Sequence, residues 1–308
     1  MMLHLIESQQ FTKEIILKLF NRADELRTNK FNLFAGKVLA TLFYEPSTRT
    51  RLSFEAAMLK LGGQVITTEN AKEFSSASKG ESIEDTIRIV GTYADCIVLR
   101  HYEDGASKKA SLISNVPIIN AGDGKGQHPT QALLDIYTIF RELGRINNIK
   151  IAIVGDLSHG RTVRSLSYVL GKYEGIELIF VSPPHLTIGL DIKEYLDKHN
   201  ISWREETDLD KILPEIDIVY LTRIQKERMS SIEYFDAKGK YVLNERNLFL
   251  LKPTSRVMHP LPHVEEIDLS VEIEKNDPRI AYFRQAENGL YIRMAILEMV
   301  LLENEKIN

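Results

Sequence analysis

Short apolar runs alternate with segments of helical period along the first half of the chain. The runs, whose length and composition are typical of buried strands, cover residues 38–43, 64–67, 96–99 and 117–119. Apolar residues recur at helical spacing in residues 11–28, 49–61, 82–94 and 128–141. Strands that alternate with helices in this way predict a parallel sheet covered by helices on both faces.

The same alternation begins again after a polar, glycine-containing segment, 141–148, which we interpret as a domain junction. Strands are expected at 151–154, 177–181, 218–221 and 257–258, and helices near 161–172, 191–199 and 208–213. A last, strongly apolar helix is expected at about 288–303. Such a helix needs a partner surface, and we expect it to pack back on the first domain.

These elements predict an α/β protein with two doubly wound parallel-sheet domains. We place the first domain at residues 1–140 and the second at 141–287, with the terminal segment, about 288–308, packed on the first. A chain of 308 residues is long for one hydrophobic core, which agrees with two domains. Sheets of this kind bind ligands at the carboxyl ends of their strands, so the active site is expected in the cleft between the domains.

Composition and charge argue against several classes of function. Hydrophobic residues make up 44% of the chain and charged residues 27%, as in ordinary globular proteins. The net charge of −4 gives no general attraction to nucleic acid or to an anionic membrane, so an anion site must be built locally. The chain has one cysteine and no apolar window typical of a signal peptide or a membrane span. We therefore expect a cytoplasmic protein without nucleic-acid or membrane partners.

The segment from Glu45 to Arg51 joins the first predicted strand to a helix and collects hydroxyl and cationic side chains. Pro46 ends the strand, and Ser47 is a residue type that favours the helix N-cap. The N-terminus of a helix carries about half a positive charge, to which Arg49 and Arg51 add their own. This pattern predicts an anion site, for phosphate in particular. The alternative is a capped helix with solvated arginines.

Two further segments carry polar side chains where predicted strands end, which is where an α/β site is built. Ser75 and Lys79 belong to a loop of small residues, for which a flexible helix start is the simpler interpretation. Arg100 directly follows a strand, where Glu103 or Asp104 as an ionic partner would also explain it.

A glycine-rich loop, 120–127, leads to His128 and Gln131. Glycines let the backbone bend closely around a ligand. His128 and Gln131, three residues apart at a helix start, are placed to offer a ring nitrogen and an amide on one face. A glycine loop followed by a histidine that contacts nothing is the alternative.

The second half of the chain repeats this arrangement with arginines. Arg161 begins a predicted helix, and Arg223 and Gln225 alternate along an extended segment after a strand. The guanidinium fork matches a carboxylate, so two such arginines predict a ligand with two carboxylates. A structural salt bridge is the alternative for either arginine alone. The rigid segment 259–262 has few N–H donors and offers carbonyl oxygens to an amide or amine.

Several common motifs are absent from the sequence. The loop after residue 154 lacks the G-x-G-x-x-G of dinucleotide sites, and neither a Walker lysine motif nor a zinc-type spacing of Cys and His occurs. No G-x-S-x-G elbow supports covalent serine chemistry. We therefore expect neither a metal nor a redox cofactor.

Four of these segments, taken in order, resemble the aspartate/ornithine carbamoyltransferase family over almost the whole chain. They are S-T-R-T-R at 47–51, G-D-G with H-P-T-Q at 122–131, R-I-Q-K-E-R at 223–228 and H-P-L-P at 259–262. The last two resemble the aspartate-specific members, whereas ornithine-specific members have H-C-L-P and a D-x-x-S-M-G segment. Pro260 stands in place of that cysteine, and no Ser-Met-Gly occurs. His263 departs from the family, in which many members have Arg at this position.

The resemblance implies transfer of the carbamoyl group of carbamoyl phosphate to the α-amine of L-aspartate, the committed step of de novo pyrimidine biosynthesis, without a cofactor. It implies catalytic roles for Arg49, Thr50, Lys79, Arg100, His128 and Gln131. It assigns carbamoyl phosphate to Ser47, Thr48, Arg49, Thr50, Ser75, Lys79, Arg100, His128, Gln131, Pro260 and Leu261. It assigns aspartate to Lys79, Arg161, Arg223 and Gln225. Arg51 is interpreted as a structural, salt-bridged residue.

The resemblance also implies partners. Ser75 and Lys79 resemble a loop that, in this family, enters the site of a neighbouring subunit, so a homotrimer with shared active sites is implied. The chain has no zinc-type cysteine set, so a zinc-containing regulatory chain, if one binds, is a separate polypeptide. Two alternatives stay open: an ornithine-type or other amino-acid carbamoyltransferase, and a non-enzymatic binding protein of two α/β lobes.

Overall fold

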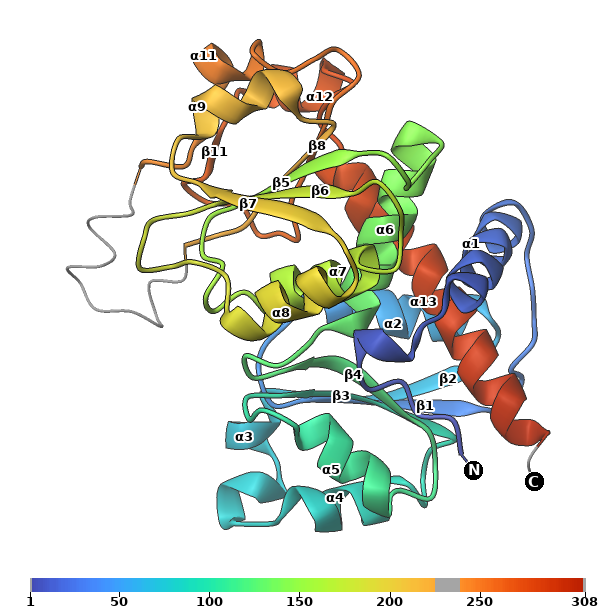
Figure 1. Ribbon diagram of the computed structural model, residues 1–308. Helices are drawn as coiled ribbons and strands as arrows, with labels where there is room; N and C mark the ends of the chain where they lie inside the picture. The colour runs from blue at the N-terminus through green and yellow to red at the C-terminus, as the bar shows by residue number, and fades with distance from the viewer. Residues whose placement is uncertain (1, 225–238, 307–308) are drawn as a thin grey trace. The chain divides into compact units, whose positions relative to one another are not determined.

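The computed structural model describes residues 2–224 and 239–306 (Figure 1). Contacts between residues divide the chain into two compact units. Unit 1 comprises Met1–Leu134 and Glu287–Asn308, and unit 2 comprises Asp135–Ala286. Both boundaries fall inside helices, α6 (Pro129–Leu143) and α13 (Tyr282–Glu305). The limits expected from the sequence, after residues 140 and 287, lie within the same two helices.

Unit 1 is built on a four-stranded parallel sheet with the order β2-β1-β3-β4. The strands are β1 (Val38–Phe43), β2 (Gln64–Glu69), β3 (Cys96–His101) and β4 (Ile118–Asp123). Leu39 of β1 pairs with Val65 on one side and with Cys96 on the other. Apart from the partly buried Val38, the apolar residues of β1 and β3 are buried, as expected for central strands covered on both faces.

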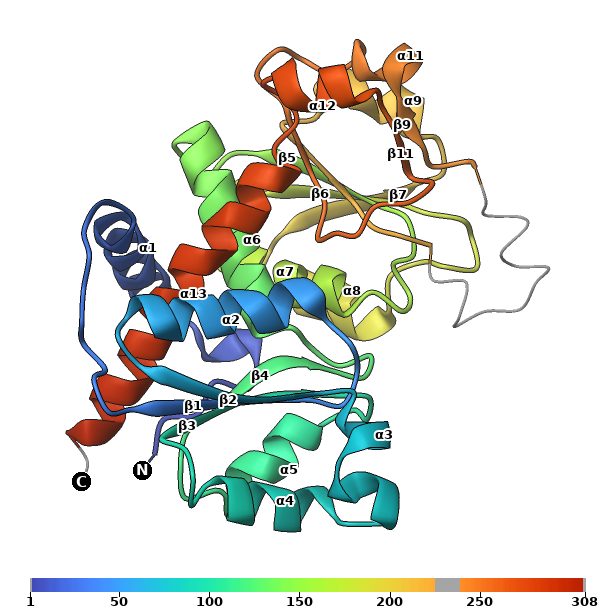
Figure 2. The same ribbon diagram turned by 180° about the vertical axis from the view of Figure 1, so that it is seen from behind.

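Helices cover both faces of this sheet, α2 on one and α4 with α5 on the other (Figures 1 and 2). The helices are η1 (Ser8–Gln10), α1 (Lys13–Thr28), α2 (Thr48–Lys60), α3 (Ala71–Phe74), η2 (Ser76–Lys79), α4 (Ile83–Val90) and α5 (Ala106–Ile113). The C-terminal part of α13 also belongs to this unit. Asn304 accepts a hydrogen bond from the N–H of Leu3 at 2.8 Å, and Glu298 lies 2.9 Å from the guanidinium of Arg22.

Unit 2 is built on a five-stranded parallel sheet with the order β10-β8-β5-β6-β7. Its strands are β5 (Lys150–Val154), β6 (Glu177–Val181), β7 (Ser202–Glu206), β8 (Ile218–Leu221) and β10 (Arg256–Met258). A small second sheet pairs β9 (Leu243–Asn244) with β11 (Ile267–Asp268).

The helices of unit 2 also lie on both faces of its larger sheet. Helices α7 and α8 lie on one face, and α9, α11 and α12 lie on the other (Figures 1 and 2). Their bounds are α7 (Arg161–Leu170), α8 (Leu190–Lys198), α9 (Leu209–Ile212), η3 (Leu213–Glu215), α11 (Glu245–Leu248) and α12 (Val271–Asn276).

The predicted fold class, α/β with two parallel sheets, is confirmed. Among the described elements, β7, α5 and α12 were not predicted, and neither were the short elements η1, α3, η2, β9, α11 and β11. Strand β7 has the sequence S-W-R-E-E and lies at the edge of its sheet, where one side of the strand faces solvent and an apolar run is not needed. Helix α13 begins at Tyr282, earlier than expected.

The parallel arrangement determines where a site can form in each unit. Because the strands of a sheet all run one way, the segments that follow β1, β3 and β4 emerge at one edge of unit 1. Those that follow β5, β8 and β10 emerge at one edge of unit 2. Within the described ranges, no helix combines the length and the apolar character needed to cross a membrane.

Candidate active site

The turn after β1 starts α2, and Ser47 is the N-cap residue of this helix. Contrary to the expectation from its residue type, the Ser47 side chain makes no capping hydrogen bond. Its backbone lies outside the helix, at φ −160° and ψ 86°, and its N–H donates to Glu69 Oε1 at 3.3 Å. Because the hydroxyl does not occupy the helix end, it can bind an anion together with the N–H groups of the first turn.

The two arginines of this turn differ in their surroundings. Nη1 of Arg51 lies 3.1 Å from Glu55 Oε1, and Nη2 lies 2.9 Å from Glu69 Oε2. The interpretation of Arg51 as a salt-bridged residue is therefore confirmed. Arg49 is exposed and makes no ion pair with any residue that the structure describes. Partial burial lowers the pKa of Arg49, but a guanidinium stays protonated at neutral pH, so Arg49 is the available cation of this turn.

Thr50 and His128 meet at the start of α6. Thr50 Oγ1 lies 3.5 Å from His128 Nε2, and Thr130 Oγ1 lies 3.4 Å from Nδ1 of the same ring. Thr50 and His128 are buried, with 6% and 4% of their surface exposed, and Gln131 in the first turn of α6 is 7% exposed. The structure therefore brings the predicted site residues Thr50 and His128 into contact. It places Gln131, a third predicted site residue, close to His128 in the first turn of α6.

Arg100 lies near the carboxyl end of β3, and 14% of its side chain is exposed. Its Nη1 donates to the carbonyl of Ala121 at 3.4 Å, and its Nε lies 3.7 Å from Glu45 Oε2. Glu45 is therefore a carboxylate near Arg100, in addition to the Glu103 and Asp104 that its place in the sequence suggested as partners. Ala121 belongs to β4, so Arg100 lies against the strand that leads into the glycine-rich loop.

Asp123 organises that loop, although the sequence interpretation gave it no role. Its Oδ1 accepts hydrogen bonds from the N–H of Gln127 at 3.1 Å and from Nδ2 of Asn120 at 3.2 Å. Gly124 has a φ of +44°, and a Cβ there would lie 2.8 Å from a backbone nitrogen of the neighbouring loop, so the turn requires glycine. The Gly-Asp-Gly run was the available signal, because aspartate side chains stabilise tight turns.

Ser75 and Lys79 lie in a separate segment of unit 1. The Ser75 hydroxyl donates to the carbonyl of Ala71, and its oxygen accepts from the N–H of Ala77 at 3.2 Å. Lys79 is exposed at the end of η2, and no residue of the described chain pairs with it. Among the described residues of unit 1, Lys79 forms no hydrogen bond or ion pair with another predicted site residue.

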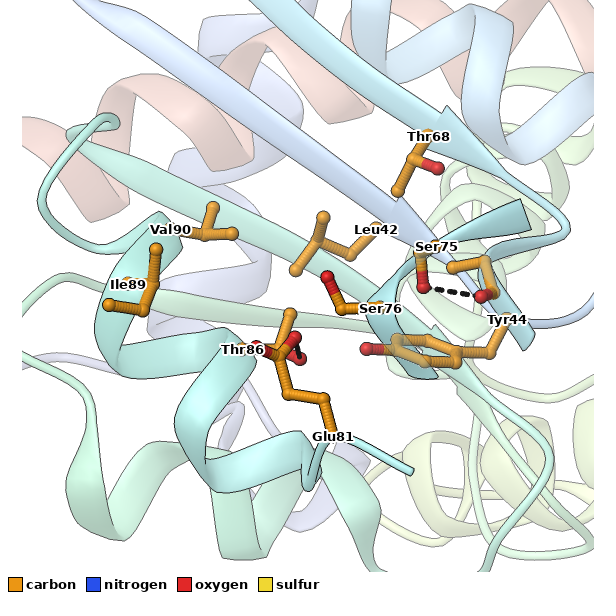
Figure 3. A pocket seen from close by; sticks show the side chains of 10 residues that line it. Leu42, Tyr44, Thr68, Ser75, Ser76, Glu81, Thr86, Ile89 and Val90 are labelled. Atoms are coloured by element: carbon orange, nitrogen blue, oxygen red, sulfur yellow. Dashed lines mark hydrogen bonds between the residues drawn. The ribbon is translucent and has the colours of Figure 1, made fainter. Parts of the chain in front are cut away.

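A cavity of about 210 Å³ lies beneath this segment (Figure 3). Its lining is mainly apolar at one end and carries hydroxyls and a carboxylate at the other; it comprises Leu42, Tyr44, Thr68, Ala71, Ser75, Ser76, Glu81, Thr86, Ile89 and Val90. Thr86 Oγ1 donates to Glu81 Oε2 at 2.8 Å, and burial raises the pKa of Tyr44. Ser75 is the one predicted site residue among those that line it.

In unit 2, Arg161 and Arg223 follow neighbouring strands. Val154 of β5 pairs with Leu221 of β8 in parallel, so the segments after them emerge at the same edge. Arg161 is the first residue of α7, Arg223 is the second residue after β8, and both are half-buried. Gln225 lies outside the described residues.

Two backbone features fix the segment that carries Arg223. The N–H and the hydroxyl of Thr222 donate to the carbonyl of Val154 at 2.8 Å and 2.9 Å. Gly155 has a φ of +117°, and a Cβ there would lie 2.3 Å from the Thr222 oxygen, so only glycine allows this close approach.

The segment 259–262 is held by side chains. Nδ1 of His259 accepts from the N–H of Leu261 at 2.7 Å, and the His259 N–H donates to Oε1 of Gln285 at 2.8 Å. Leu261 has a φ of +55°, and the bond between Leu261 and Pro262 is cis. His259 Nε2 lies 2.8 Å from Glu266 Oε1. Burial would raise the pKa of Glu266, but the hydrogen bond with His259 lowers it overall.

Each unit thus presents one kind of binding site. Unit 1 offers a helix N-terminus, an exposed arginine, the buried Thr50 and His128 and the partly buried Arg100, which suit a phosphate and an adjacent polar group. Unit 2 offers arginines after two neighbouring strands, which suit a dicarboxylate. Among the residues that the structure describes, no group of three or more His, Cys, Asp or Glu side chains is arranged to hold a metal ion.

Two domain families match the chain. The carbamoyl-P binding domain of aspartate/ornithine carbamoyltransferase matches residues 3–141, and the Asp/Orn binding domain of the same proteins matches residues 147–300. The chain is 54% identical to aspartate carbamoyltransferase 1, chloroplastic, of Pisum sativum, over 96% of this chain and 78% of the relative. It is 51% identical to the aspartate carbamoyltransferase catalytic subunit of Methanocaldococcus jannaschii, over 99% of each chain.

Solved structures agree with these matches. The catalytic subunit of M. jannaschii aspartate transcarbamoylase superposes with a TM-score of 0.89 at 49% identity, covering 98% of this chain and 99% of that chain. Aspartate transcarbamoylase from Trypanosoma cruzi, in complex with carbamoyl phosphate and aspartate, superposes with a TM-score of 0.88 at 37% identity, covering 96% and 94%. The same T. cruzi protein has been solved with N-(phosphonacetyl)-L-aspartic acid.

Proposed function

The chain belongs to the aspartate/ornithine carbamoyltransferase family, and we propose that its two units each hold one substrate of the reaction. The reaction is transfer of the carbamoyl group of carbamoyl phosphate to the α-amine of L-aspartate, which gives N-carbamoyl-L-aspartate and phosphate. The aspartate carbamoyltransferases that match most of the chain, and the substrate complexes of the T. cruzi enzyme, support this reaction. It corresponds to the committed step of de novo pyrimidine biosynthesis.

The phosphate of carbamoyl phosphate binds at the start of α2. The Ser47 hydroxyl, the N–H groups from Thr48 to Thr50 and the Arg49 guanidinium surround it. This assignment is supported by the helix end that Ser47 leaves uncapped and by the exposed charge of Arg49. The helix N-terminus and the Arg49 guanidinium act together, because both attract the dianionic phosphate group.

The carbonyl oxygen of the carbamoyl group meets Thr50, Arg100 and His128. When the aspartate amine attacks, this oxygen becomes negatively charged, and a donor already aimed at it lowers the barrier by about 3–4 kcal/mol. The contact between Thr50 and His128 supports a common target for both side chains. Gln131 and the carbonyls of Pro260 and Leu261 receive the carbamoyl NH2.

The bond changes balance without a further reactant. A C–N bond forms between the aspartate amine and the carbamoyl carbon, and the C–O bond to phosphate breaks. The amine attacks in its unprotonated form, and the proton it then releases can pass to the departing phosphate, which is basic enough to accept it. Fixing the two reactants in one geometry can contribute on the order of 7–11 kcal/mol.

Arg161 and Arg223 bind the two carboxylates of aspartate, with Gln225 and Lys79 as further contacts. The observation that supports a dicarboxylate acceptor is that both arginines follow neighbouring parallel strands, β5 and β8. Ornithine has one carboxylate and a second amine, so one of two guanidinium groups would face a like charge.

A competition assay tests the acceptor. The purified chain is incubated with carbamoyl phosphate and equal concentrations of aspartate and ornithine, and the products are separated by mass. We expect N-carbamoyl-L-aspartate as the product. Carbamoylated ornithine alone would overturn the assignment, and no turnover with either would favour the non-enzymatic binding protein.

The active site is shared between the subunits of a homotrimer, with Ser75 and Lys79 reaching a neighbouring subunit. The exposed position of Lys79, which forms no ion pair with any described residue, supports this arrangement. A separate regulatory chain as a further partner is supported by the name "catalytic subunit" given to the M. jannaschii relative. A cytoplasmic location remains a prediction from the sequence.

A further inference from the structure

Asp135 is a fully buried carboxylate of α6 that none of the roles above involves. Its Oδ2 accepts a hydrogen bond from the Tyr220 hydroxyl at 2.7 Å, and its Oδ1 accepts one from Nε2 of Gln285 at 2.6 Å. Tyr220 and Gln285 are 0% and 1% exposed. A buried carboxylate requires such donors because it has lost its hydration, so Asp135 holds three elements, α6, β8 and α13, in one arrangement.

The Gln285 side chain extends this arrangement to the segment 259–262. Its Oε1 accepts the N–H of His259 at 2.8 Å, and Nδ1 of His259 accepts the N–H of Leu261 at 2.7 Å. A ring nitrogen that accepts from an amide carries no proton, so the ring proton lies on Nε2, which faces Glu266 Oε1 at 2.8 Å. The tautomer of His259 is therefore set by its neighbours.

The hydrogen bonds of His259 hold the backbone of Leu261 in an uncommon conformation. Its φ of +55° lies in the left-handed region, which non-glycine residues adopt only where surrounding contacts enforce it. This backbone conformation sets the directions of the carbonyls of Pro260 and Leu261. The hydrogen bonds that enforce it lead back, through His259 and Gln285, to Asp135.

Tyr220 extends the arrangement from Asp135 to the arginines. It lies in β8, three residues before Arg223. Burial and the Asp135 charge raise the pKa of Tyr220 well above its ordinary value, so its hydroxyl remains a hydrogen-bond donor. The same side chain forms a hydrogen bond with Thr162, which directly follows Arg161 at the start of α7.

We propose that Asp135 is a positioning residue for both ligand-binding parts of unit 2. Through Gln285 it orients the carbonyls of segment 259–262, and through Tyr220 it fixes the strand that leads to Arg223. The inference rests on the proposed function, in which that segment receives the carbamoyl NH2 and Arg223 binds aspartate. Asp135 itself touches neither substrate, and it acts on the reaction only through these two side chains.

Variants that remove one of the two hydrogen bonds of Asp135 at a time separate its effect on segment 259–262 from its effect on Arg223. Gln285→Leu keeps Tyr220 bonded to Asp135, and we expect kcat/KM for carbamoyl phosphate to fall roughly tenfold or more while KM for aspartate stays unchanged. Tyr220→Phe keeps the segment 259–262 bonded, and we expect the KM for aspartate to rise by a similar factor while that for carbamoyl phosphate stays unchanged. Asp135→Asn should both lower kcat/KM for carbamoyl phosphate and raise KM for aspartate.

Asp217→Asn is the matched control for these variants. Asp217 is also a largely buried carboxylate of unit 2, whose oxygens accept from the N–H of Lys150 and from Nζ of Lys252, both at 2.9 Å. We expect this variant to lower the melting temperature and to leave both kcat/KM for carbamoyl phosphate and KM for aspartate unchanged. If Asp135→Asn behaves in the same way, Asp135 is a structural residue and the proposal is wrong.

The remaining outcomes are also decisive. If Asp135→Asn does not fold, Tyr220→Phe and Gln285→Leu provide the test, and unchanged constants in both overturn the proposal. If the wild-type chain does not carbamoylate aspartate, the proposed function itself fails, and this inference fails with it. Wild-type turnover with unaltered constants in all three variants refutes the positioning role alone.

Discussion

Thr50 Oγ1 lies 3.5 Å from Nε2 of His128, although 78 residues separate them in the chain. One side chain comes from the first turn of α2 after β1, and the other from the loop after β4. We expect Thr50→Val to lower kcat by roughly 10²–10³-fold, because a donor to the developing oxyanion is lost while the side-chain volume is kept. Steady-state kinetics measures this.

Thr67→Val is the control for that substitution. Its hydroxyl donates to Glu55 Oε1 at 2.7 Å, so the same chemical change also removes a hydrogen bond but lies in β2, outside the proposed site. We expect its kcat to match the wild type. An equal loss of kcat in both variants would show that Thr50 acts through the fold and not on the oxyanion.

Arg49 and Arg51 offer a second test, because they share one helical turn and differ in partners. We expect Arg49→Ala to abolish turnover and to leave the melting temperature unchanged, since Arg49 is exposed and makes no ion pair within the described ranges. Arg51→Ala removes contacts to Glu55 and Glu69 and should cost roughly 1–2 kcal/mol of unfolding free energy. A large drop in melting temperature for Arg49→Ala would favour a structural role instead.

Shared active sites in a trimer predict complementation between inactive variants. Arg49→Ala and Lys79→Ala chains are each purified, then unfolded together and refolded as a mixture. If Lys79 acts on a neighbouring subunit, some sites of a mixed trimer receive both wild-type residues, and activity returns. Mixed assemblies confirmed by native mass that stay inactive would mean that both residues act within one chain.

Glu142 links stability to pH. It accepts hydrogen bonds from Nε of Arg284 at 2.6 Å and from Nε of Arg256 at 2.8 Å. Burial alone would raise the pKa of Glu142, but the two guanidinium groups lower it below its ordinary value of 4.5. A carboxylate whose pKa is depressed by folding stabilises the native state above its unfolded pKa, and this contribution disappears as the pH falls through the folded value.

We therefore expect Glu142→Gln to lower the free energy of unfolding by roughly 1–3 kcal/mol at pH 7. The difference from the wild type should shrink as the pH falls from about 4.5, the unfolded value, through the lower folded pKa of Glu142, because the wild-type carboxylate then also becomes neutral. Urea unfolding at pH 7 and pH 3 measures both values, with Glu194→Gln, an exposed carboxylate of α8, as the control. A difference that is independent of pH would contradict this role for Glu142.

The sequence was sufficient for the fold class because the buried strands of both sheets are continuous apolar runs. Strands β1, β3, β5 and β8 were predicted for this reason, whereas β7 was missed because an edge strand can be polar. The start of α13 was also misjudged, since its first residues, Tyr282 to Ala286, include two charged or amide side chains in a helix that is apolar later on.

Residues with a recognisable motif were identified from the sequence, and residues that act through long-range contacts were not. Asp135 lies 85 residues from Tyr220 and 150 from Gln285, and in the sequence it is one polar residue within an amphipathic helix. The absence of a capping hydrogen bond from the Ser47 hydroxyl was equally unpredictable, because the residue type indicates a preference for the N-cap position but not the direction of the side chain. For Arg100, no signal in the sequence indicated that Glu45, which is distant in the chain, lies near its guanidinium.

In the proposed reaction both units are needed, since unit 1 would bind the phosphate part and unit 2 the dicarboxylate part. N-(phosphonacetyl)-L-aspartate joins a phosphonate to an aspartate and so presents both groups in one molecule. Calorimetric titration of the wild type, Arg49→Ala and Arg161→Ala with this compound tests the claim. Arg164→Ala is the control, because Arg164 lies one turn along α7 and pairs with Asp191.

We expect the wild type and Arg164→Ala to bind one molecule per chain with equal affinity, and Arg49→Ala and Arg161→Ala each to weaken binding at least tenfold. This factor corresponds to about 1.4 kcal/mol, within the range for one lost charge-assisted contact. Unchanged affinity in either Arg49→Ala or Arg161→Ala would contradict the proposal that the two units bind the two halves of one reacting pair.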